Sequence, residues 1–341
     1  MKFSVTIDVE EDNWNRYSRT ENPVHNVKRL LTLQELFDRY GVRPTYLVDY
    51  PVVTDPVAVG ILKEFLEHDK CEIGMHCHPW NTPPFTEELS DFNSMLSNLP
   101  EVLVSKKLTV LHAAIMENLQ VKPVSFRAGR WGFSRSVAMA LKELGYRIDT
   151  SVSPYVDWSD EHGPDYSQFQ LLPYRFDPVN IASPRESGVL FEVPTTVGFL
   201  QGDFARCQKW TQQLKNAVGR KLRLQGIFAR LGLLNKVWLS PELSDAKSML
   251  KLMQRLEARS VPVLNMSFHS TSLMAGLTPF VLTVADEISF LERIEAVLAF
   301  ALEAEYKFLT LAEYEAQCTG SAPNAGQVKV MAKPAPCLGL S

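Results

Sequence analysis

The sequence predicts an α/β fold in which a parallel sheet forms a single barrel-like domain. Apolar segments of strand length alternate with segments whose apolar residues recur at helical spacing, which is the pattern of βαβ units. Polar residues gather at or just after the ends of several predicted strands, where parallel α/β folds place their active sites. No linker divides the 341 residues, so we expect one domain over residues 1–318 rather than two.

The composition is close to the average for globular proteins. The chain has 35 basic and 39 acidic side chains, a formal net charge of −4 and 45% hydrophobic residues. These values exclude a disordered, collagen-like or coiled-coil chain, and they argue against binding nucleic acid through general positive charge. No stretch reaches the roughly 18 apolar residues of a membrane span.

The N-terminus and the cysteines predict a cytoplasmic, reducing compartment. Asp8 and Glu10 interrupt the first apolar segment before it reaches the about 7–15 residues of a secretory signal. The cysteines are odd in number and scattered, so they do not form a disulfide framework; they are Cys71, Cys77, Cys207, Cys318 and Cys337.

The predicted elements follow from hydrophobic periodicity and its breaks. The first strand, 2–8, is a buried strand that ends in carboxylates, and 27–40 is a helix because its apolar residues recur at helical spacing until Gly41. The later strands are predicted at 43–49, 71–78, 123–127, 147–152, 189–193, 261–268 and 307–310. The later helices are predicted at 57–68, 103–119, 134–144 and 287–304.

Three segments depart from this alternation. Residues around 153–188 are rich in Pro, Tyr and Asp and predict an irregular insertion. Residues around 204–236 predict a helical, basic segment; we favour a solvated surface, and the alternative is a weak peripheral contact with the inner face of a membrane. Residues 319–341 are rich in Gly, Ala, Pro and Ser and predict a flexible tail.

His76 and His78 form the sharpest local motif. Residues two apart on a strand project to the same face, so both imidazoles can reach one ion. Imidazole suits Zn, Fe, Ni and Cu. The alternative is a pair of packed or solvated histidines at a strand end.

The first strand ends in an acidic segment that contains Asp8, Glu10 and Glu11. It can be a solvated loop, but its place after a buried strand favours a role in the site. Asp8 and Glu10 also stand two residues apart. One carboxylate can complete a His-His-carboxylate set while the other acts as a base.

Three further polar residues follow predicted strands. His269, Arg127 and Asp149 each have an ordinary alternative when taken alone: a structural strand-end histidine, a surface arginine and a turn residue.

Taken together, these elements resemble the polysaccharide deacetylase family, the NodB-homology carbohydrate esterases, in a divergent branch with an H-x-H metal motif. That family has an aspartate motif at the end of strand one, paired metal-binding histidines, an arginine motif, an Asp-x-Ser motif and a late histidine motif, in this order. The matches are TIDVE at 6–10, GMHCHP at 74–79, FRAGRWG at 126–132, DTS at 149–151 and FHS at 268–270. The resemblance extends over about residues 1–312 and implies a NodB-like, distorted (β/α) barrel of seven strands with insertions.

The resemblance also implies metal-dependent hydrolysis of an N-acetyl or O-acetyl group. Asp8 would be the base and His269 the acid. Arg127 would keep Asp8 ionised, and Asp149 would orient His269 and raise its pKa. His76 and His78 would be metal ligands, with Glu10 as the third ligand and Glu11 or Asp8 as alternatives, because the family's adjacent Asp-Asp pair is Asp-Val-Glu here.

The metal implied is divalent, with Zn first and Co, Fe, Ni or Mn as alternatives. The substrate implied is an acetylated sugar of a cell-envelope polysaccharide, lipopolysaccharide or glycan precursor. Trp80, Trp131 and Tyr155 are candidates for stacking on a sugar ring, although each can equally be a core residue. Two other functions stay open on the same fold: hydrolysis of a non-carbohydrate C–N bond, and non-catalytic carbohydrate binding.

Overall fold

The computed structural model describes residues 1–14, 16–214 and 231–320, and the sheet in these residues is built around parallel strands. The strand order is β10-β1-β2-β3-β4-β5-β7-β6, with β11 beside β1. The strands from β10 to β7 pair in parallel, and β6 pairs with β7 in antiparallel fashion. Their bounds are β1 Lys2–Val9, β2 Thr45–Val48, β3 Glu72–Cys77, β4 Ser125–Ala128, β5 Ile148–Asp149, β6 Tyr174–Phe176, β7 Leu190–Glu192, β10 Val263–His269 and β11 Lys307–Phe308.

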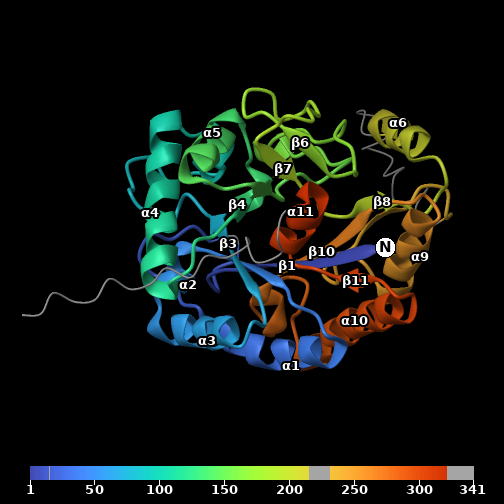
Figure 1. The fold of residues 1–341 in the computed structure, drawn as a ribbon, viewed down its shortest axis with the longest axis horizontal. Helices are drawn as coiled ribbons and strands as arrows, with labels where there is room; N and C mark the ends of the chain where they lie inside the picture. The colour runs from blue at the N-terminus through green and yellow to red at the C-terminus, as the bar shows by residue number, and fades with distance from the viewer. Residues whose placement is uncertain (15, 215–230, 321–341) are drawn as a thin grey trace, which may run out of the picture.

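Helices surround this sheet (Figure 1). In the view of Figure 1, α1, α3 and α10 lie along the lower edge, α4 and α5 on the left and α9 on the right. The helices described are α1 Leu30–Tyr40, α2 Tyr50–Thr54, α3 Pro56–Glu67, α4 Glu101–Leu119, α5 Arg135–Leu144, α6 Phe204–Leu214, α9 Ala246–Glu257, α10 Val284–Glu303 and α11 Leu311–Thr319. Short 3-10 helices include η1 His25–Arg29, η4 Gly129–Trp131 and η6 Ser270–Leu273.

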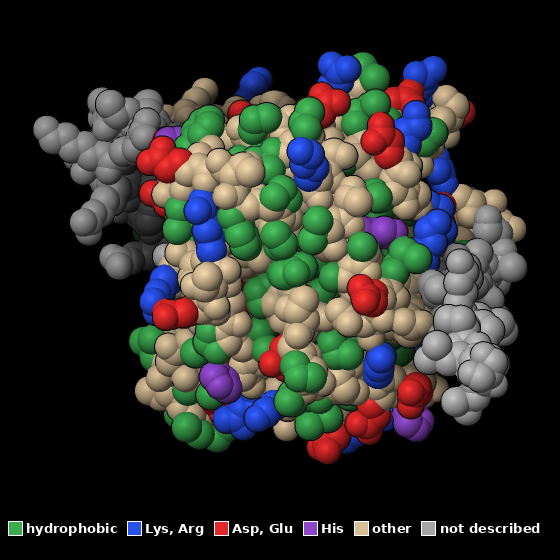
Figure 2. All heavy atoms as spheres, turned by 90° about the vertical axis from the view of Figure 1, so that its left-hand side faces the viewer, with side chains coloured by type: hydrophobic (Ala, Val, Ile, Leu, Met, Phe, Trp, Pro, Cys, Tyr) green, Lys and Arg blue, Asp and Glu red, His purple; other side chains and the backbone are tan. Residues whose placement is uncertain are grey.

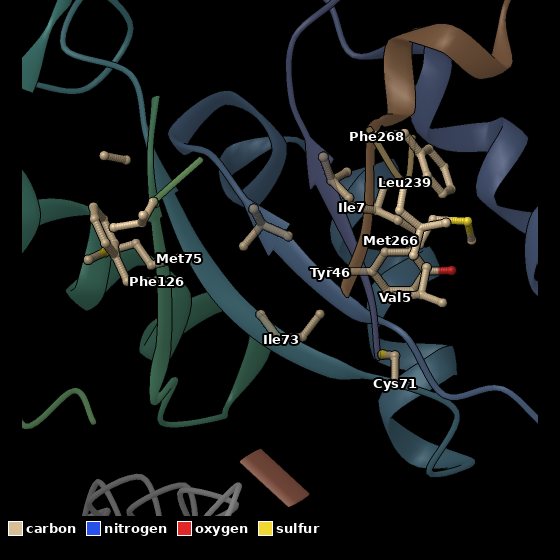
Figure 3. Close-up of a cluster of buried hydrophobic side chains, with 14 of the residues drawn as sticks. Val5, Ile7, Tyr46, Cys71, Ile73, Met75, Phe126, Leu239, Met266 and Phe268 are labelled. Carbon is tan, nitrogen blue, oxygen red and sulfur yellow. The ribbon is translucent and has the colours of Figure 1, made fainter. Parts of the chain in front are cut away.

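The strands carry apolar side chains on one face and mostly polar ones on the other. In β1, Val5 and Ile7 belong to the hydrophobic core, which Figure 3 shows together with Met75, Phe126 and Met266 of neighbouring strands. The residues between them on β1 are Ser4, Thr6 and Asp8, which are buried as well. Because neighbouring residues of a strand point to opposite faces, the polar set shares the inner face of the curled sheet. The inner face is therefore polar along β1, whereas Ile148 and Phe191, which pair in register with Ser125 of β4, belong to a second apolar cluster together with Leu311 and Tyr314 of α11.

Side chains from distant strands meet inside the barrel. Arg127 on β4 donates from Nη2 to Oγ1 of Thr6 on β1, at 2.6 Å. Thr6 donates in turn to Oδ1 of Asn265 on β10, at 2.9 Å, and Nδ2 of Asn265 donates to Oγ1 of Thr150, at 2.9 Å. These bonds satisfy buried polar groups that would otherwise cost free energy.

A second sheet closes the gap between the two ends of the parallel array. It pairs β8 Val197–Phe199 with β9 Lys236–Trp238 in antiparallel fashion. On its β10 side, the backbone N–H of Thr196 donates to Asn265 O, and that of Ser267 donates to Leu239 O, both at 3.1 Å. In Figure 3, Leu239 lies beside Met266 and Phe268 of β10. The expected curled α/β barrel is therefore confirmed, with an irregular seam between β7 and β10.

Two helices, α9 and α11, lie in segments for which the sequence analysis predicted no helix. Asp245 caps the N-terminus of α9, since its side chain accepts from Ser248 N, and the helix buries Met249, Leu252, Met253 and Leu256. The start of α11 rests against the first residues of β2 and β3. There, Leu311 N donates to Oγ1 of Thr45 and Ala312 N donates to Oε2 of Glu72. Neither helix contains any of the five motifs on which the sequence interpretation was based.

The basic segment can be followed only in part. α6 confirms a helix at its start, whereas residues 215–230, which carry most of its predicted basic residues, lie outside the described residues, as does the predicted tail from residue 321. Among the residues that the structure describes, no helix combines the length and the hydropathy needed to cross a membrane. On the face shown in Figure 2, basic and acidic side chains lie interspersed.

Candidate active site

Six of the side chains singled out in the sequence meet at the C-terminal edge of the barrel strands. They come from β1, β3, β4 and β10 or from the residue that follows a strand. Each has a charged or imidazole group within 4.0 Å of another member of the set. They are Asp8, Glu10, His76, His78, Arg127 and His269.

The two histidines of the H-x-H motif point at one another. Their Nε2 atoms lie 3.0 Å apart. Oε2 of Glu10 lies 3.6 Å from Nε2 of His76 and 3.4 Å from Nε2 of His78. All three side chains are buried, so one carboxylate and two imidazoles enclose a single small volume.

Hydrogen bonds on the far side of each ring determine the imidazole tautomers. Nδ1 of His76 lies 3.0 Å from Arg127 O, and Nδ1 of His78 lies 3.3 Å from Oε2 of Glu11. A carbonyl and an ionised carboxylate only accept, so both Nδ1 atoms carry the proton and both Nε2 lone pairs face the shared volume. Support of this kind behind the ring is typical of metal-ligating histidines.

This arrangement fits a divalent metal ion. Two lone pairs at 3.0 Å repel one another unless a cation lies between them. In a tetrahedral zinc site with Zn–N bonds of about 2.0–2.1 Å, two ligand nitrogens stand about 3.3 Å apart, close to the separation here. Burial raises the pKa of Glu10 to about 7, and a bound cation would favour its ionised form.

Glu11 stands behind His78 instead of facing the shared volume. Its carboxylate accepts from Nε1 of Trp80 at 2.7 Å and from Nδ2 of Asn81 at 2.8 Å, in addition to His78. Although burial acts in the opposite direction, the charge of His78 and the hydrogen bonds from His78, Asp49 and Trp80 lower the pKa of Glu11 to about 2. Among the three carboxylates considered from the sequence, Glu10 is the one with an oxygen within 3.6 Å of both Nε2 atoms.

Glu11 is also part of a second group of potential ligands, with Asp49 and His78. Asp49 caps α2 through Val52 N, and burial together with the charge of Glu11 raises its pKa well above the usual range. A protonated Asp49 beside an ionised Glu11 forms a hydrogen-bonded support for His78, and the donors around Glu11 already occupy its oxygens.

Asp8 is held by a buried arginine. Nη1 of Arg127 lies 2.7 Å from Oδ1 of Asp8, and the same guanidinium donates to Thr150 O from Nε. Burial raises the pKa of Asp8, but Arg127 and then His76 outweigh it, so the pKa is lowered. Asp8 is therefore ionised at neutral pH, as a base must be.

His269 faces Asp8 and is backed by a carboxylate. Its Nε2 lies 3.7 Å from Oδ2 of Asp8, and its Nδ1 lies 3.0 Å from Oε2 of Glu242. Burial lowers the pKa of His269, but the charge of Glu242, followed by that of Glu10, raises it to about 10. The imidazole is therefore a cation at neutral pH and can act as an acid.

The prediction that Asp149 orients His269 is wrong. Thr150, the residue that follows β5, points into the barrel and contacts Arg127, so the preceding Asp149 points to the opposite face. There Asp149 accepts from Oγ of Ser151 at 2.7 Å. The carboxylate that holds His269 is Glu242, which follows β9.

Gly129 gives His78 its space. A Cβ at this position would lie 2.3 Å from Cδ2 of His78 and 2.6 Å from Cys77 O. Real Cβ atoms do not approach other atoms so closely, so any other residue here would displace the ring or the backbone. The glycine in the FRAGRWG motif therefore has a local steric explanation.

A pocket of about 430 Å³ opens over these groups, within the range of small-molecule sites. Five of the six tryptophans line it: Trp14, Trp80, Trp131, Trp158 and Trp238. Trp80 and Trp131 thus lie where the sequence interpretation placed them.

Tyr155 does not line the pocket. Its ring packs against Phe199 and Phe204, with centroids 5.6 and 6.0 Å apart, on the outer side of the seam. Of the two alternatives drawn from the sequence, a sugar-stacking ring or a core residue, the packing of Tyr155 between β8 and α6 favours the core residue.

Sequence reasoning missed Glu242, Trp14 and Trp238. Glu242 stands in a loop without strand or helix periodicity, and its partner His269 is 27 residues away. The tryptophans themselves were the available signal for Trp14 and Trp238, because most tryptophans of this chain line one pocket.

No family model matches the chain, and no curated protein matches it. Solved structures are similar to it. A protein provisionally assigned as a polysaccharide deacetylase from Mycobacterium smegmatis is 15% identical, with a TM-score of 0.51, over 98% of this chain and 94% of that one. A family 4 acetyl xylan esterase from Clostridium thermocellum, in complex with a cobalt ion, is 12% identical, with a TM-score of 0.43, over 95% of this chain and 94% of that one. A CE4 family pseudoenzyme from Bacillus anthracis is 13% identical, with a TM-score of 0.43, over 92% of this chain and 64% of that one.

The chain is thus a (β/α)-barrel protein with a buried His-His-carboxylate cluster in the mouth of the barrel. Its barrel is of the NodB type, the fold that the Mycobacterium smegmatis structure shares over nearly its full length. The resemblance to polysaccharide deacetylases, drawn from the five motifs, is confirmed at the level of the fold.

Proposed function

We propose that this chain is a metal-dependent deacetylase that hydrolyses an N-acetyl or O-acetyl group of a carbohydrate. The observation that supports this most is the meeting of three units in one pocket: the Glu10, His76 and His78 cluster, the ionised Asp8 and the cationic His269. Hydrolysis of an acetyl group needs an electrophile, a base and an acid in these relative places.

Glu10, His76 and His78 would hold the metal, with Zn as the first choice and Co, Fe, Ni or Mn as alternatives. When bound, the metal would supply Lewis-acid polarisation of the acetyl carbonyl and a source of nucleophile at neutral pH. Glu11 and Arg127 O, through the two Nδ1 protons, hold the histidine rings in the ligating orientation.

Asp8 accepts the proton of the attacking water. Its pKa is low because Arg127 contacts it, and the same contact fixes the direction of the carboxylate. His269 donates a proton from Nε2 to the departing amine or alcohol. Glu242, which is bound to Nδ1, keeps that proton on the ring until it is needed.

The pocket lining supports a carbohydrate over a small amide. Flat indole faces suit the apolar faces of sugar rings, and Trp131, Trp158 and Trp238 stand together at one wall. We propose an envelope or glycan-precursor sugar handled inside the cell as the substrate. A cyclic amide would leave most of this aromatic wall unused.

Metal analysis and acetate release test the proposal. Purified protein should contain close to one divalent ion per chain and should release acetate from acetylated amino sugars or their oligomers. Replacing His76 and His78 together by alanine should remove the ion and abolish release. His68→Ala is the matched control, because its ring is exposed and bonded to Glu64 O. Full activity in the metal-free double variant would contradict the mechanism.

A further inference from the structure

The loop that follows β1 lies over the candidate site. We call its described residues, 12–14 and 16–24, the strap. Asp12 fastens its base: Oδ1 accepts from Asn26 N and Nδ2, and Oδ2 accepts from His25 N. Asp12 N donates to Pro23 O at 2.8 Å, so both ends of the strap are tied together.

The strap contacts two opposite sides of the pocket. Trp14 packs edge-on against His269, with centroids 4.9 Å apart, and against Phe280, at 5.5 Å. Tyr17 packs on Trp80, with centroids 4.8 Å apart. The strap therefore joins the β10 side of the site to the β3 side.

Arg130 extends this connection to the insertion after β5. Its Nη1 donates to Oη of Tyr17 at 2.6 Å and to Oγ of Ser94 at 2.5 Å, and its Nη2 lies 3.4 Å from Oε2 of Glu161. One guanidinium thus links three segments along the rim of the pocket. Arg130 and Trp131 both have positive φ, 51° and 62°, a conformation that costs energy for non-glycine residues and recurs at functional sites.

The tryptophan wall completes the rim. The rings of Trp131 and Trp158 stack with centroids 6.3 Å apart and planes 12° apart, and Trp238 lies 5.8 Å from Trp131. The remaining side is lined by Leu243, Pro279 and Phe280. The pocket therefore has walls from the strap, the segment after β4, the insertion, the segment after β9 and the segment after β10.

We propose that this rim makes the site an end-on site, which accepts the terminal acetylated unit of a short or end-presented glycan and excludes the interior units of a linear polymer. The inference rests on the proposed deacetylase function. An interior unit would need the pocket open on two opposite sides for the chain to pass. The bridge from Tyr17 through Arg130 to Glu161 lies across one such path and would clash with a continuing chain.

A chain-length series tests this inference. Acetylated oligosaccharides of one sugar type, from one unit to a long polymer, are incubated with the enzyme, and mass spectrometry of fragments locates each lost acetyl group. Loss of acetyl groups should be confined to one terminal unit at every chain length. The value of kcat/KM divided by the number of acetyl groups should therefore be inversely proportional to chain length. Removal of interior acetyl groups at a comparable rate would overturn the inference.

A variant that opens the rim sharpens the test. Tyr17→Ala combined with Arg130→Ala should raise the ratio of interior to terminal deacetylation at least tenfold. Arg16→Ala is the matched control, because that side chain belongs to the strap but pairs at the surface with Glu21; its ratio should stay at the wild-type value. An unchanged ratio in the double variant, with its thermal stability retained, would count against the rim as the selecting feature.

A binding measurement separates this inference from the proposed function. Calorimetry with the Asp8→Asn variant should detect binding of short glycans that expose an acetylated terminus and should detect none for a polymer with blocked termini. Polymer binding with blocked termini would overturn the end-on inference. Absence of acetate release from every length, together with end-selective binding, would instead overturn the proposed catalysis alone.

Discussion

Nδ1 of His269 lies 3.0 Å from Oε2 of Glu242, and the same carboxylate accepts from the backbone N–H of His269 and from Oγ of Ser272. These three donors fix Glu242, and Glu242 in turn fixes both the orientation and the charge of the imidazole. The acid of the proposed reaction therefore depends on Glu242, a loop residue that follows β9.

Replacing Glu242 with Gln should shift the alkaline limb of the activity profile to lower pH. Glu242 is the largest cause that raises the pKa of His269 to about 10. Without its charge the pKa falls, so His269 loses its proton at a lower pH and with it the ability to donate. The profile of kcat/KM against pH measures this shift. An alkaline limb that stays in place would show that His269 is not the acid.

Replacing Arg127 with Met should shift the acid limb to higher pH. Arg127 is the largest cause that lowers the pKa of Asp8, and burial acts in the opposite direction. Without Arg127, less charge offsets the effect of burial, so the pKa of Asp8 rises. The base then stays protonated up to a higher pH. The profile of kcat/KM gives the shift, and circular dichroism checks the fold. Thermal unfolding of Arg135→Met, an exposed arginine on α5, gives the reference for a change without a buried partner.

Replacing Gly129 with Ala should weaken metal binding. The added Cβ would lie 2.3 Å from Cδ2 of His78, so the ring must move away from its ligating position. Changing a residue that supports a metal ligand typically costs about 10–100-fold in metal affinity. We expect a loss of at least this order here, which competition with a chelator measures. Gly60→Ala on α3 is the control, because nothing lies within 4 Å of its added Cβ. Equal affinities in the two variants would contradict the assignment of His78 as a ligand.

Replacing Lys107 with Met should destabilise the protein by about 3–5 kcal/mol, the usual cost of breaking a buried charge pair. Nζ of this fully buried lysine donates to the carbonyls of Pro79, Thr82 and Pro84 and lies 2.8 Å from Oε1 of Glu87. The loop that carries Trp80 and Asn81 is thus tied to α4.

Urea denaturation measures that loss for Lys107→Met. Lys106→Met is the matched control, since Lys106 is the exposed neighbour on the same helix, and it should change the free energy of unfolding by less than about 0.5 kcal/mol. Similar losses in the two variants would refute a stabilising role for Lys107.

The sequence predicted the fold class and most of the candidate site because both depend on local patterns. Strand and helix periodicity placed β1, β3 and α4 close to their observed bounds, and the H-x-H spacing placed His76 and His78 on one face. The polar residues after the strands could be brought together because carboxyl ends of parallel strands share an edge.

The rest depended on information that is not local. Asp149 and Thr150 are neighbours, and which of them faces the barrel is decided by the register of a two-residue strand. Glu242 reaches His269 only because the β8–β9 sheet closes the seam. Tyr155 is distinguished from Trp131 by its tertiary packing alone.

The polar inner face of β1 separates two demands that many proteins must meet with the same residues. The hydrophobic packing that holds β1 lies between the sheet and the helices, with Val5 and Ile7, whereas the reactive groups point the other way. An inward-facing side chain can be exchanged for another of similar size without opening a void in that apolar layer. The lining of such a barrel is therefore free to acquire new chemistry while its exterior continues to maintain the architecture.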